Sequence, residues 1–166
     1  MTPEFKQYAI QVKKNARALG DALVKKGYTI CTGGTDNHLI LWDVRPLGLT
    51  GSKIEKVCDE VNISLNKNTV HGDKSAVAPG GVRIGTPALT TRGLKEKDFY
   101  QVADYLDQVV KISLEIQNSG KKLLKDFVPA IKQNPKTAEL AKAVGNFATT
   151  FPMPGFDTTS MKYKNI

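Results

Sequence analysis

The fold class is decided by Tyr28-Thr29-Ile30-Cys31-Thr32, Gly33-Gly34-Thr35-Asp36-Asn37 and Leu39-Ile40-Leu41-Trp42, three segments of one stretch. The outer segments are rich in apolar and β-branched residues, as short strands are, and the middle segment is built from residues that favour turns. We therefore expect an antiparallel hairpin here. Its first strand should run to Thr32, and its second strand should be buried on both faces.

Two further short strands are predicted downstream, at Ile63-Ser64-Leu65 and Val82-Arg83-Ile84. A short helix should precede them, because Ser52 and Glu55 have the spacing of a capping box. Its inward positions would be Ile54, Val57, Cys58 and Val61. The polar segment 66–81 separates the two strands and is expected to form a long loop. Loops of this length inside a compact domain are often functional.

The rest of the chain has helical periodicity. The first helix should begin after Thr2 and end at Gly27, with one apolar stripe from Phe5 to Leu23. Further apolar stripes predict three more helices: a long one from Phe99 to near Gly120, and two more over 123–131 and 135–151. A helix as long as the first, with one narrow stripe, needs a partner surface to cover it.

The order of these elements predicts an α/β fold, in which helices cover one side of a small, mostly antiparallel sheet. We divide the chain into a leading helix (1–27), a small domain (28–151) and a tail (152–166).

Composition excludes several classes of protein. With 40% hydrophobic and 24% charged residues, the chain is neither intrinsically disordered nor embedded in a membrane. Two cysteines make no disulfide framework and no secretory signal is evident, so we expect a cytoplasmic protein. The net charge of +8 is spread along the whole chain. That distribution is typical of a solvated surface, and it supports RNA binding only weakly.

Few residues have an obvious chemical role. His38 and His71 lack the spacing of metal ligands, so we expect no metal site, and no nucleotide-binding or nucleophile motif is present. Arg83 is unusual because it stands in the middle of a short strand. Either the strand alternates and Arg83 points to water, or its planar, permanently charged guanidinium is held for a carboxylate or a phosphate.

Three motifs strongly resemble one family, serine hydroxymethyltransferase. They are Thr32-Gly33-Gly34-Thr35-Asp36-Asn37-His38-Leu39, Asn66-Lys67-Asn68-Thr69 and Gly81-Val82-Arg83-Ile84-Gly85-Thr86-Pro87-Ala88-Leu89-Thr90-Thr91-Arg92-Gly93. The similarity runs in order from Thr2-Pro3-Glu4-Phe5 to Phe151-Pro152-Met153-Pro154-Gly155, a closing motif that looks like the eukaryotic cytosolic or plant-like branch. It matches only the C-terminal portion of a family member.

The resemblance implies the C-terminal small domain of a fold-type I transferase that uses pyridoxal 5′-phosphate. The complete enzyme would convert serine and tetrahydrofolate to glycine and 5,10-methylenetetrahydrofolate in one-carbon metabolism, and it would be a homo-oligomer. The family's cofactor-binding lysine and catalytic glutamate belong to an N-terminal large domain whose motifs are not in this chain. The resemblance therefore implies that this chain holds no catalytic residue and is inactive alone.

The same resemblance assigns ligand contacts to residues of this chain. Arg83 matches the arginine that binds the α-carboxylate of serine or glycine, and Asn68 matches the asparagine that binds the pteridine of tetrahydrofolate. Lys74 and Ser75 fall in the loop that flanks the folate tail. Residues 36–38 match a family motif, but we assign them structural roles. The alternative is a non-catalytic, free-standing small domain that binds RNA, a folate or a protein partner.

Overall fold

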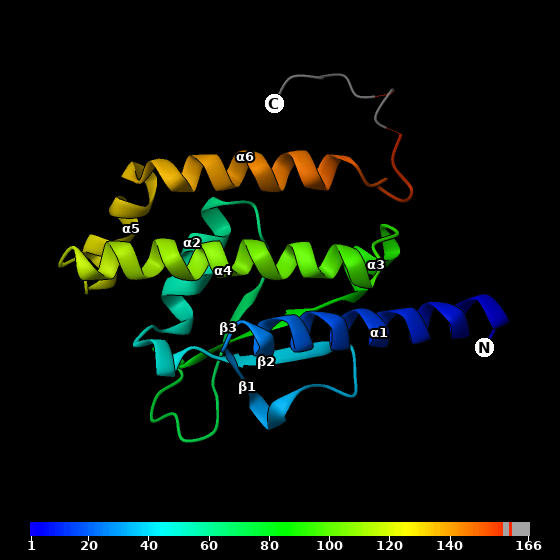
Figure 1. Cartoon of the computed structure of the whole chain (residues 1–166), viewed down its shortest axis with the longest axis horizontal. Helices are drawn as coiled ribbons and strands as arrows, with labels where there is room; N and C mark the ends of the chain where they lie inside the picture. The colour runs from blue at the N-terminus through cyan, green and yellow to red at the C-terminus, as the bar shows by residue number, and fades with distance from the viewer. Residues whose placement is uncertain (158–159, 161–166) are drawn as a thin grey trace.

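The computed structural model describes residues 1–157 and 160, in which helices and a small sheet alternate along the chain (Figure 1). The helices are α1 (Pro3–Lys25), α2 (Gly51–Glu60), α3 (Pro87–Thr91), α4 (Glu96–Asn118), α5 (Leu124–Gln133) and α6 (Pro135–Thr149). The strands are β1 (Thr29–Ile30), β2 (Leu39–Asp43), β3 (Asn66–Asn68) and β4 (Gly81–Gly85). This order confirms the predicted α/β fold.

The strands form one sheet in the order β1-β2-β4-β3, and every neighbouring pair is antiparallel. Ile40 lies opposite Ile84, and Trp42 lies opposite Val82; all four side chains are buried on the face that the helices cover. The intervening Leu41 is only half-buried. The prediction that this strand is buried on both faces is therefore wrong. Burial alternates along β2 because the helices cover one face of the sheet.

Helices α1 and α2 lie on the sheet, and α4 packs against both of them, between α1 and α6 (Figure 1). Thr2 caps α1 as expected, because its Oγ1 accepts a hydrogen bond from Phe5 N at 3.3 Å. The apolar stripe of α1 is buried within the domain from Val12 to Leu23. Phe5 is 53% exposed, because the first turns of α1 extend past the sheet (Figure 1).

Two predicted strands have different boundaries in the structure. The strand predicted at 63–65 lies three residues later, at Asn66–Asn68, where it pairs with β4. The apolar signal came from Leu65, which is buried in the core just before the strand. The first hairpin strand ends at Ile30 rather than Thr32. Thr32 has a φ of 63°, a left-handed conformation that a strand does not contain.

The short helix α2 begins at Gly51 with Thr50 as its cap, so the predicted cap at Ser52 is wrong. Gly51 is held against the segment that leads into β4: its N–H donates to Pro79 O at 2.7 Å. A Cβ atom at this position would lie 2.0 Å from Gly81 O, so only glycine fits. The predicted inward residues Ile54, Val57, Cys58 and Val61 are all fully buried.

The three predicted C-terminal helices are present as α4, α5 and α6, whereas α3 was not predicted. Arg92 follows α3 and donates to Phe151 O at 2.9 Å and to Pro152 O at 3.1 Å, which ties α3 to the end of α6. Of the predicted tail, 152–157 and 160 are exposed, while 158–159 and 161–166 lie outside the described residues. In the part of the chain that the structure describes, no helix is both long and apolar enough to cross a membrane.

Candidate functional site

The open face of the sheet carries the polar side chains of the candidate site. In an antiparallel pair, directly opposed residues point to the same face. Arg83 of β4 lies opposite Leu41 of β2 on one side and Asn66 of β3 on the other. Asn68 lies two residues beyond Asn66 and opposite Gly81, so the register places it on the same face as Arg83. The sheet thus places Arg83 and Asn68 on the same face, although they come from segments that are separated in sequence and Asn68 does not line the cleft that contains Arg83.

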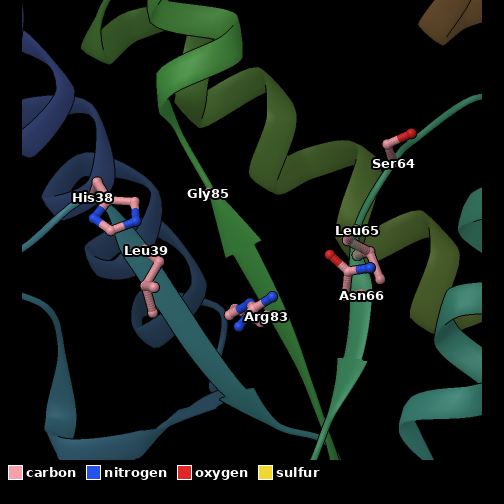
Figure 2. A pocket seen from close by; sticks show the side chains of 7 residues that line it. All are labelled: His38, Leu39, Ser64, Leu65, Asn66, Arg83 and Gly85. Carbon is pink, nitrogen blue, oxygen red and sulfur yellow. The ribbon is translucent and has the colours of Figure 1, made fainter.

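A cleft of about 520 Å³ lies over this face. It is lined by His38, Leu39, Ser64, Leu65, Asn66, Arg83 and Gly85 (Figure 2). Figure 2 shows the side chain of Arg83 between those of Leu39 and Asn66. The cleft therefore extends across β2, β4 and β3, with Arg83 on the middle strand of the three.

The Arg83 side chain is exposed and has no hydrogen bond or ion pair with any other described residue. Its flanking residues Val82 and Ile84 point into the core. The strand therefore alternates, and the guanidinium stands on the open side. All five of its N–H donors are free of protein partners among the residues described here, so they are available to a ligand.

Asn68 is half-buried at the far end of β3. Its side-chain amide nitrogen donates to Thr69 O at 2.7 Å, which leaves the amide oxygen as an acceptor. The facing position must be glycine: a Cβ atom on Gly81 would lie 2.5 Å from Val70 Cγ1 and 2.8 Å from Trp42 O. The Val70 side chain therefore fills the space over Gly81.

Lys74 and Ser75 are exposed in the loop that joins β3 to β4. The Ser75 hydroxyl accepts a hydrogen bond from Val77 N at 3.1 Å, whereas Lys74 has no ion-pair partner among the residues described here. The preceding residue, Asp73, anchors the loop. Backbone amides that donate to its carboxylate, chiefly that of Gly80, hold the pKa of Asp73 below its usual value.

The first 106 residues match the family model of serine hydroxymethyltransferase. The chain belongs to the serine hydroxymethyltransferase family. Its relatives include serine hydroxymethyltransferase 4 of Arabidopsis thaliana, 56% identical over 164 residues, which are 99% of this chain and 35% of that protein. The serine hydroxymethyltransferase of Bombyx mori is 50% identical over 161 residues, which are 94% of this chain and 34% of that protein.

The chain spans about a third of the length of these serine hydroxymethyltransferases and corresponds to their C-terminal portion. Relatives named as mitochondrial, from Candida glabrata, and as chloroplastic, from Arabidopsis thaliana, are 44% and 47% identical to it. Family membership therefore does not assign a compartment, and the cytoplasmic location stays a prediction.

Residues 36–38 match a family motif, and we assign them structural roles. In the structure, hydrogen bonds to nearby residues hold this motif in place. Asp36 Oδ1 accepts from Arg17 Nη2 at 2.8 Å, and Asn37 Oδ1 accepts from Leu39 N at 2.9 Å. The backbone oxygen of His38 accepts from Thr86 N at 3.0 Å. The His38 side chain nevertheless lines the cleft, which sequence reasoning did not predict.

Sequence reasoning also missed Asn66 as a cleft residue. Its position opposite Arg83 follows directly from the register, but only when β3 is placed at Asn66–Asn68. No group of three or more His, Cys, Asp or Glu residues that could hold a metal ion occurs among the described residues. Cys58 is fully buried, and burial raises the pKa of its thiol, so it is unsuited to nucleophilic chemistry.

Proposed function

We propose that this chain is the part of a serine hydroxymethyltransferase that contacts the amino-acid carboxylate and the folate. The complete enzyme, a homo-oligomer, would transfer the hydroxymethyl carbon of serine to tetrahydrofolate and release glycine. The observation that carries the proposal is the position of Arg83: its exposed side chain lines a cleft, has no hydrogen-bond or ion-pair partner among the described residues, and lies on the same sheet face as Asn68.

Arg83 is proposed to bind the α-carboxylate of serine. A guanidinium offers two parallel N–H donors that match the two oxygens of a carboxylate, and its charge persists across physiological pH. Because β4 fixes its backbone between two hydrogen-bonded strands, the bound amino acid would be oriented as well as attracted.

Asn68 is proposed to bind the pteridine ring. Its amide oxygen remains available as an acceptor for a ring N–H. Lys74 and Ser75, in the adjoining loop, are proposed to contact the folate tail, whose carboxylates suit a cation. Lys74 has no competing carboxylate partner among the described residues.

The residues of the cleft do not fit the covalent attachment of pyridoxal 5′-phosphate. The lining set contains no lysine, and attachment as a Schiff base requires a lysine amine. We therefore assign the cofactor's attachment to the remainder of the complete protein. This chain would act on the substrates only, by binding and orienting them.

The test compares this chain with the complete protein that contains it. We expect the complete protein, loaded with pyridoxal 5′-phosphate, to produce glycine from serine only when tetrahydrofolate is present. We expect the chain alone to retain no cofactor absorbance after dialysis and to turn over no serine. Turnover by the chain alone, or a complete protein that is inactive with serine, would contradict the proposal.

A further inference from the structure

Arg45 connects three parts of the chain at the base of the loop between β3 and β4. Its guanidinium donates to both carboxylate oxygens of Asp43, from Nε at 3.0 Å and from Nη2 at 2.8 Å. Nη2 also donates to His71 O at 3.0 Å, and Nη1 donates to Asp73 Oδ1 at 3.3 Å. One side chain thus joins the end of β2 to two points of the loop.

Asp73 closes the loop through its other carboxylate oxygen. Oδ2 accepts from Val70 N at 2.9 Å and from Gly80 N at 2.7 Å, so it holds together residues from the two ends of the loop. The Asp73 side chain is only 8% exposed. A buried carboxylate must be paired or fully hydrogen-bonded, and here the two amides and Arg45 satisfy it.

Gly80 allows this arrangement because it has no side chain. A Cβ atom on Gly80 would lie 2.5 Å from Arg45 Cδ and 2.7 Å from Asp73 Oδ1. The backbone oxygen of Gly80 in turn accepts from Val44 N at 2.9 Å. The end of the loop is therefore fixed to the segment that follows β2, with the stem of Arg45 packed over it.

We propose that Arg45 and Asp73 are positioning residues for the folate contacts, an inference that rests on the proposed function. Asn68 lies two residues before Val70, whose amide Asp73 holds, and Lys74 follows Asp73 directly. Asn68 and Lys74 therefore both lie close to backbone that the Asp73 hydrogen bonds hold in place. Because Arg45 also binds Asp43 at the end of β2, and β2 pairs with β4, the loop is held at a set place relative to Arg83.

The positioning role predicts an effect on one substrate and not on the other. Displacing the loop moves the groups that contact the folate, whereas Arg83 stays in its strand. In the complete enzyme, Arg45→Gln should raise KM for tetrahydrofolate by about tenfold and leave KM for serine within about twofold. Asp73→Asn should act in the same direction. Arg17→Gln is the matched control, because Arg17 pairs with the exposed Asp36 away from the loop.

A second measurement reports on the loop without using activity. Amide hydrogen exchange in this chain should be faster by about tenfold or more at Val70 and Gly80 in Arg45→Gln, and unchanged at Thr86 N, which donates within the sheet region. Gly80→Ala should have the same effect with every charge kept, because the added Cβ displaces the Arg45 stem.

The outcomes separate the inference from the proposed function. Unchanged exchange at both amides would overturn the clamp, and faster exchange with an unchanged KM for tetrahydrofolate would overturn its role in positioning. An equal rise in both KM values with a lower melting temperature would reduce Arg45 to a structural residue and overturn the inference. If the unsubstituted complete protein has no tetrahydrofolate-dependent activity, the proposed function fails and the positioning role fails with it.

Discussion

Replacing Arg83 should damage serine turnover without damaging the fold. The side chain is exposed and has no hydrogen-bond or ion-pair partner among the described residues, so its removal breaks no contact that stabilises the domain. We expect Arg83→Ala to change the unfolding free energy of the chain by no more than about 0.5 kcal/mol. Chemical denaturation of this chain, with and without the substitution, measures this difference.

The catalytic loss follows from the number of bonds that the guanidinium would make. A carboxylate bound to both arms of the fork accepts two charge-assisted hydrogen bonds, each worth about 1.5–3 kcal/mol. The cleft is open to water, so we use the lower value for each bond, which sums to about 3 kcal/mol. This sum corresponds to a loss of about 100-fold in kcat/KM for serine in the complete enzyme.

Arg83→Lys distinguishes the fork from the charge alone. A lysine keeps the charge but offers no planar pair of donors, so it should recover at most about tenfold of the loss. Steady-state kinetics with serine as the varied substrate, at saturating tetrahydrofolate, are the assay. If Arg83→Ala keeps the serine kcat/KM of the unsubstituted enzyme, Arg83 does not bind the carboxylate and the site assignment is refuted.

Four further predictions concern the sheet, its loop and α6. Asn68→Ala should raise KM for tetrahydrofolate by about three- to tenfold with little change for serine, whereas Lys67→Ala, on the opposite face of β3, should leave both values unchanged. Gly81→Ala should destabilise the chain to denaturant by about 1–3 kcal/mol, because its Cβ would lie 2.5 Å from a neighbouring side chain. Gly145→Ala, where a Cβ meets nothing within 4 Å inside α6, should instead stabilise it by about 0.5–1 kcal/mol. The Val70 and Gly80 amides, which donate to Asp73, should be protected from hydrogen exchange at pH values above the ordinary aspartate pKa of about 4. This protection should be lost as the pH falls through the lower pKa that Asp73 has in the folded chain. Exchange rates that do not change with acidification, after correction for intrinsic chemistry, would show that this carboxylate does not hold the loop.

The helices were the most predictable elements, because the spacing of their apolar residues indicates which face of each helix is buried. The stripe of α1 and the buried positions of α2 are both present in the structure. The short strands were less predictable. Asn66–Asn68 is polar because it lies at the edge of the sheet, so the apolar residues just before it carried the stronger strand signal.

The candidate site was only partly predictable. Local pattern left the direction of Arg83 undecided, and the register of the sheet decides it, because Val82 and Ile84 pair with buried residues of β2. The Asp43–Arg45–Asp73 cluster could not be predicted from spacing, since Arg45 and Asp73 are 28 residues apart. Long-range ion pairs of this kind depend on how a loop returns to the sheet.

The central claim is that the open face of the sheet receives the amino acid through Arg83. A crystal structure of the complete protein with glycine bound tests it most directly. We predict that both carboxylate oxygens of glycine lie about 2.7–2.9 Å from guanidinium nitrogens of Arg83. A carboxylate bound by other residues, with the Arg83 guanidinium directed into solvent, would contradict the account.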